Sequence, residues 1–77
     1  MSIKTFGGFL VIIEEANPFD EDAALIGFVL KSDGQEKPPE KKNVVWRRSG
    51  EARWLGNAYD LPAETVDLLV REHRKDA

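Results

Sequence analysis

The segment 44–55 constrains the fold of this chain more than any other, because it holds both tryptophans and three arginines around a Ser-Gly pair. Two runs of residues that favour β-strands flank Ser49-Gly50, and this pattern predicts a β-hairpin. The length of its loop decides where the tryptophans point. A two-residue loop puts the two indoles on opposite faces. A three-residue loop, with Gly50 left-handed in a bulge, puts both on one face.

We favour the three-residue loop because it separates apolar from charged side chains. The apolar face then carries Val44, Trp46, Ala52 and Trp54. The opposite, mainly charged face carries Val45, Arg47, Glu51 and Arg53. In this arrangement the indoles are expected to turn toward the core. In the two-residue register, by contrast, Trp46 becomes an exposed anchor.

Length and composition limit the classes of protein to which this chain can belong. Its 77 residues predict one domain, 1–77, with a small core, since a chain of this size buries only roughly 60% of its unfolded surface. Without cysteine it can form neither a disulfide framework nor a zinc-thiolate site. The apolar run 6–13 is too short to cross a bilayer, and Glu14-Glu15 follows it without a cleavage site. We therefore expect a complete small open reading frame that encodes a cytoplasmic protein without membrane association.

The first part of the chain predicts two strands joined by a turn. The β-prone run 9–13 lies in a strand over 3–15, where Gly7-Gly8 indicates a bulge or bend. A phosphate-binding loop is the alternative for this glycine pair, but no helix start and lysine follow it. Asn17-Pro18 begins the turn, and a second strand is expected over 24–31. The polar residues 32–43 predict a mobile loop or a binding loop.

A helix is predicted over 61–75, after the hairpin. Pro62 and Glu64 suit its first turn, and Val66, Leu69, Val70 and His73 recur at helical spacing. Val66, Leu69 and Val70 should be buried. The fold class is therefore α+β, a small antiparallel sheet of about four strands with one C-terminal amphipathic helix packed on one face.

Catalysis is not expected, because no reactive constellation can be assembled. His73 is the sole histidine, and no orienting acid or nucleophile can be named for it, which favours a residue at the edge of the core. The acids Asp20-Glu21-Asp22 lack the alternating oxygen ligands and glycine of a calcium loop. Neither a metal nor another cofactor is predicted.

Binding is the more plausible activity, and charge indicates where it could occur. Residues 1–40 hold three basic and eight acidic side chains, whereas residues 41–77 hold eight and six. The candidate partner-binding cations are Lys41, Lys42, Arg47, Arg48 and Arg53. The candidate aromatic anchors are Trp46 and Tyr59. Trp, Tyr and Arg are the residue types that most often dominate interface energies.

These features predict a small non-enzymatic regulator or inhibitor that binds another protein. Its size class suggests a phage or mobile-element protein that acts on host machinery. The alternative is a single-stranded nucleic-acid-binding domain that uses the Trp/Arg hairpin, since such domains combine basic grooves with stacking aromatics.

Overall fold

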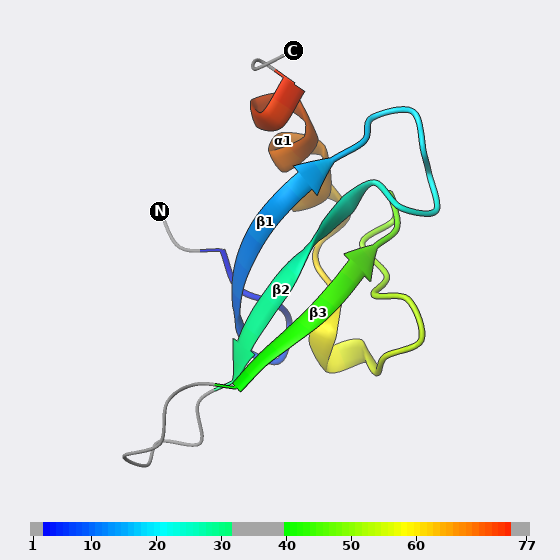
Figure 1. Cartoon of the computed structure of the whole chain (residues 1–77). Coiled ribbons are helices and arrows are strands. Elements are labelled where there is room, and N and C mark those ends of the chain that lie inside the picture. The colour runs from blue at the N-terminus through cyan, green and yellow to red at the C-terminus, as the bar shows by residue number, and fades with distance from the viewer. Residues whose placement is uncertain (1–2, 32–39, 75–77) are drawn as a thin grey trace.

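The computed structural model, which describes residues 3–31 and 40–74, contains an antiparallel sheet and a C-terminal helix (Figure 1). The elements follow in the order β1 (Leu10–Ala16), β2 (Leu25–Lys31), β3 (Glu40–Trp46), the 3-10 helix η1 (Asn57–Tyr59) and α1 (Ala63–Arg74). β2 lies between β1 and β3 and is antiparallel to both. The α+β architecture agrees with the prediction.

Within residues 3–31 and 40–74 the sheet has three strands, so the prediction of about four was wrong. The missing strand is the second half of the hairpin. Trp46 and Ala52 form an isolated bridge, and Arg53 N–H donates to the Val45 carbonyl at 2.9 Å. A turn over 53–55 then carries the chain away from β3.

The loop of this hairpin has three residues, as we favoured. Arg47 N–H donates to the Glu51 carbonyl at 2.8 Å, and Gly50 N–H donates to the Arg47 carbonyl at 2.8 Å. Gly50 has a φ of 100°, which is the left-handed conformation that glycine adopts without strain. These bonds exclude the loop of only Ser49-Gly50, and they put Trp46 on the inner face of the sheet.

The first strand is shorter than its predicted range of 3–15. Gly8, with a φ of 85°, donates its N–H to the Thr5 carbonyl at 2.9 Å and closes a turn. The chain therefore reverses at the glycine pair, and Val11 N–H donates back to the Ile3 carbonyl at 2.9 Å. The sequence indicated a bulge or bend here, but a full reversal removes residues 3–9 from β1.

The polar segment 32–43 was predicted as one loop, and its last four residues belong to β3 instead. Lys41 and Lys42 pair with Leu30 and Val29. β3 is an edge strand over this stretch, and lysines are well tolerated on edges because they discourage pairing with other chains. Residues 32–39 of the predicted loop lie outside the described residues.

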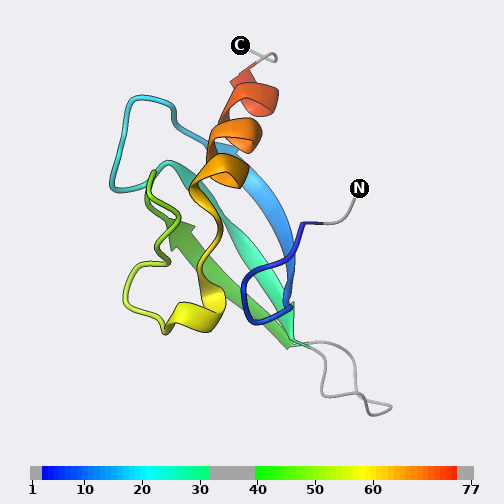
Figure 2. The same cartoon turned by 180° about the vertical axis from the view of Figure 1, so that it is seen from behind.

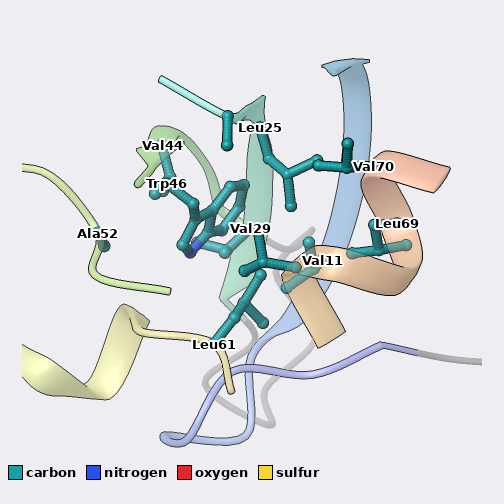
Figure 3. Packing of buried hydrophobic residues seen from close by; sticks show 11 residues of the cluster. Val11, Leu25, Val29, Val44, Trp46, Ala52, Leu61, Leu69 and Val70 are labelled. Carbon is teal, nitrogen blue, oxygen red and sulfur yellow. The ribbon is translucent and has the colours of Figure 1, made fainter. Parts of the chain in front are cut away.

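The core lies between the inner face of the sheet and α1. In Figure 2, α1 lies in front of the sheet, over the upper end of β1. Val66, Leu69 and Val70 of the helix are buried, as their spacing predicted. The remaining buried apolar residues are Val11, Ala24, Leu25, Val29, Val44, Trp46, Ala52 and Leu61. Figure 3 shows the Trp46 ring in the middle of this cluster, flanked in that view by Ala52 and Val29.

Candidate binding surface

The two tryptophans have opposite environments. Trp46 is fully buried, whereas Trp54 is 86% exposed. The expectation that both indoles of the apolar hairpin face turn inward was therefore wrong for Trp54, and the candidate role of Trp46 as an exposed anchor is also wrong. Trp54 has a φ of 59°, the only positive φ of a non-glycine residue in the described chain. A bulky side chain rarely adopts this backbone conformation, and it costs roughly 1–3 kcal/mol.

The residues 53–60, which we call the Trp54 loop, leave β3 and return to it. Ala52 N–H donates to the Asp60 carboxylate at 2.8 Å, so the base of the loop is closed by a side chain. One residue later, Leu61 N–H donates to the Gly50 carbonyl at 2.8 Å. Asp60 and Leu61 therefore bond backbone groups of 50–52 that make no bond to β3, and they hold the returning chain against the hairpin. Short loops with closed ends of this kind frequently carry function.

Arg53 stacks on the exposed indole. Its guanidinium carbon lies 4.4 Å from the centroid of the Trp54 ring, within the range of a cation–π interaction. The Arg53 Nε atom is buried and has no hydrogen-bond partner in the described part of the chain. The pair therefore presents a flat apolar surface and a guanidinium group side by side at the surface.

Tyr59 supports the base of the loop rather than projecting from it. Its half-buried ring stacks on Phe9 with a centroid distance of 5.1 Å, and its carbonyl accepts the indole hydrogen bond of Trp46. The ammonium groups of Lys31 and Lys42 lie 5.6 and 5.9 Å from the centre of the ring. A side-chain hydrogen bond with Tyr59 raises the pKa of Lys31 above its ordinary value. Tyr59, which the sequence suggested as an aromatic anchor, is therefore part of a cluster with Phe9 and two lysines.

Arg47 and Arg48, two of the predicted partner-binding cations, are engaged with acids of the same chain. Arg48 Nε donates to Asp67 on α1 at 2.7 Å. The Arg47 guanidinium lies 3.7 Å from Asp22 and 3.3 Å from Glu51. Both arginines border a depression of about 430 Å³, which is lined by Glu21, Asp22, Arg47, Arg48, Ser49 and Asp67. Its two arginines face three carboxylates, so this surface has no excess of positive charge.

The predicted cations do not form one stripe. Lys42 is opposite the core residue Val29 and so lies on the inner side of the sheet, beside Tyr59. Lys41 lies on the outer face, with its ammonium 4.3 Å from the centre of the Phe28 ring. Arg53 is on the Trp54 loop. The structure brings together Arg53 with Trp54 and Lys42 with Tyr59, and Arg53 shares the outer side of the hairpin with Arg47 because it is opposite Val45.

The acidic turn Asp20-Glu21-Asp22 is stabilised by a side chain of its own. The Asp20 carboxylate accepts hydrogen bonds from the N–H groups of Asp22 and Ala23, at 3.0 and 3.1 Å.

Within residues 3–31 and 40–74, no three His, Asp or Glu side chains gather in a way that could hold a metal ion. His73 is half-buried on the last turn of α1. No helix among the described residues is long and apolar enough to cross a membrane.

The sequence contained a signal that could have placed Trp54 at the surface. Gly56-Asn57 and Asp60 follow it closely, and such residues favour turns over strands.

Comparisons with known protein families, with curated proteins and with solved structures find no match to this chain. The surface must therefore be interpreted from its own geometry.

Proposed function

We propose that this chain is a small non-enzymatic regulator or inhibitor that binds another protein through the Trp54 loop. One observation carries the proposal: a tryptophan that is 86% exposed is held at a positive φ by a loop closed at its base. Strained backbone conformations persist where the surrounding structure enforces them, and they cluster at functional sites. A large indole in water gains free energy when a partner covers it.

The chemistry of Arg53 and Trp54 indicates the kind of surface that would accept them. The indole fits an apolar pocket, and the adjacent guanidinium pairs with a carboxylate on the rim of that pocket. Trp and Arg are enriched among the residues that contribute most to protein interfaces. Arg47 and Arg48, whose charges are already paired within the chain, contribute less in this arrangement.

Binding of single-stranded nucleic acid is the second candidate, and the exposed indole with its stacked guanidinium favours it too, since bases stack on such rings. The distribution of charge disfavours nucleic-acid binding. Arg47 and Arg48 are paired with acids, and Lys41 and Lys42 lie on opposite faces of β3. A backbone-tracking groove requires cations that are continuous along one path.

Affinity capture from the source organism with matched baits tests the proposal. The baits are the wild-type protein, Trp54→Ala, Arg53→Ala and Phe19→Ala, the last replacing an aromatic side chain that is 88% exposed elsewhere. We expect one or more proteins that are retained by the wild type and by Phe19→Ala and lost with Trp54→Ala. Arg53→Ala should retain them weakly. Equal capture by all four baits would contradict the role of the Trp54 loop.

A fluorescence titration with short single-stranded oligonucleotides separates the two candidates. It is performed at about 50 and about 200 mM salt, because binding by phosphate contacts weakens steeply over this range. Protein binding as the function predicts no saturable change in Trp54 emission at either salt concentration. Micromolar binding that weakens steeply with salt would establish the nucleic-acid alternative instead.

A further inference from the structure

The outer face of the sheet, which faces away from α1, is apolar. In Figure 1 the strands lie nearest the viewer on this side, and α1 and η1 lie behind them. Its apolar members are Leu10, Ile12, Ile26, Phe28, Leu30 and Val45. Ile12 is 40% exposed, and the others are partly exposed. An antiparallel sheet with one face in water ordinarily alternates apolar and polar residues, so this face requires an explanation.

The strand register arranges the residues of the outer face in three rows, each of which runs across the three strands. Leu10, Leu30 and Lys41 form the first row, Ile12, Phe28 and Asn43 the second, and Glu15, Ile26 and Val45 the third. Side chains that are directly opposite across antiparallel strands share a face. Phe28 is thus the centre of the face, because it lies in the middle row of the middle strand.

Two charged residues occupy diagonally opposite corners of this face. Glu15 is on β1 in the third row, and Lys41 is on β3 in the first. The ammonium of Lys41 lies over the Phe28 ring at 4.3 Å, which confirms that its side chain is on this side of the sheet. Neither residue takes part in the ion pairs formed among the described residues.

We propose that the outer face binds the same face of a second copy of this chain, forming a two-fold symmetric dimer. A two-fold axis that lies in the interface and is perpendicular to the Glu15–Lys41 diagonal exchanges the two corners. Each Lys41 then meets Glu15 of the second copy, and the Phe28 rings meet at the centre. The strands of the two sheets cross at a steep angle, as in the orthogonal class of sheet packing. Such an interface is self-complementary, as two-fold symmetry requires.

The size of the face sets the expected strength of this dimer. Three strands of seven residues cover roughly 14 by 23 Å. A standard stable interface buries about 800 Å² of accessible surface per partner, which is more than so small a sheet supplies. We therefore expect a dimer that dissociates in the micromolar range. The charge pairs of the proposal use only strand residues, and Arg53 of the Trp54 loop, which is opposite Val45, borders the third row of this face.

Sedimentation equilibrium from about 10 µM to about 1 mM, with circular dichroism to check the fold, tests the proposal. The variants are Lys41→Glu, Glu15→Lys and the double exchange of both charges. Each single variant puts like charges opposite each other at two places and should raise the dissociation constant roughly tenfold or more. The double exchange restores opposite charges, and its dissociation constant should return to near the wild-type value. Leu68→Ala, an exposed position of α1 on the other side of the sheet, is the control and should dimerise as the wild type does.

Two results would overturn the proposal. A wild-type protein that sediments as a monomer at every concentration would leave the outer face to a different partner. A dimer whose dissociation constant is unaffected by the single charge changes, or is not restored by the double exchange, would show that the copies meet through another surface. A failure of Trp54→Ala to bind other proteins would leave this outcome unchanged.

Discussion

The indole Nε1 of Trp46 donates a hydrogen bond to the carbonyl oxygen of Tyr59 at 2.8 Å. This bond joins the last residue of β3 to the last residue of η1 across the Trp54 loop. It satisfies the only polar atom of a fully buried ring. The Trp46 side chain therefore has two roles, since it fills the centre of the core and holds the returning chain against β3.

Substitutions of Trp46 should separate these two roles. Trp46→Ala removes the largest buried side chain and should lower the free energy of unfolding by about 3–5 kcal/mol. Trp46→Phe keeps a ring in the core but leaves the Tyr59 carbonyl without its donor, which costs about 1–3 kcal/mol. Urea denaturation followed by circular dichroism measures both. Equal losses for the two variants would mean that the ring volume contributes little.

Trp54→Gly should keep or increase stability while it removes the proposed anchor. The side chain is almost fully exposed, so little burial is lost, and glycine adopts a φ of 59° without strain. We expect the free energy of unfolding to rise by up to about 1 kcal/mol. Trp54→Ala is the matched control, because it removes the indole and keeps a Cβ at a positive φ. A clear loss of stability in the glycine variant would show that the indole packs on the protein.

The two indoles should differ in their access to a soluble quencher. Trp46→Phe leaves Trp54 as the only tryptophan, and Trp54→Phe leaves only Trp46. Acrylamide should quench the emission of the first variant strongly, with a maximum near that of free indole. The second variant should emit at shorter wavelength and resist quenching, because its indole is buried. Stern–Volmer constants of similar size would contradict the assigned burial.

Gly50→Ala should destabilise the protein by several times the effect of Gly56→Ala. A Cβ on Gly50 would lie 1.9 Å from the Leu61 carbonyl oxygen, and its φ of 100° disfavours any side chain. We expect a loss of at least about 2 kcal/mol. Gly56 has an ordinary φ of −74° and no atom within 4 Å of a built Cβ. Its substitution should be neutral or stabilise by up to about 1 kcal/mol. Thermal denaturation of both variants makes the comparison.

Leu69→Ala and Leu68→Ala test the orientation of α1. Leu69 is buried against the core, whereas its neighbour Leu68 is 42% exposed. Truncation of Leu69 should cost about 2–5 kcal/mol, and truncation of Leu68 should cost much less. Both substitutions remove the same atoms and put alanine, a strong helix former, in the same helix. A larger loss from Leu68→Ala would indicate that the helix is rotated.

Local patterns predicted the elements whose partners lie within a few residues. The spacing of Val66, Leu69 and Val70 was sufficient to identify the buried face of α1, because helical periodicity is a local property. Gly50 similarly indicated the three-residue hairpin loop. The extent of β3 was not predicted, since Lys41 and Lys42 are polar and only their pairing with β2 makes them part of the sheet.

The candidate site was likewise only partly predictable from local sequence patterns. Sequence alone determined that an aromatic hairpin with arginines would pack on an antiparallel sheet, and it placed Val44 and Trp46 on one face. Only the tertiary structure decided that Trp54 leaves that face, because a turn over 53–55 ends the pairing with β3 and the returning chain is bonded to Ala52 and Gly50 through Asp60 and Leu61. It also decided that Arg47 and Arg48 pair with Asp22 and Asp67, which come from distant parts of the chain. Side-chain alternation is a local property, but where a strand ends and which acids an arginine meets depend on parts of the chain that are distant in sequence.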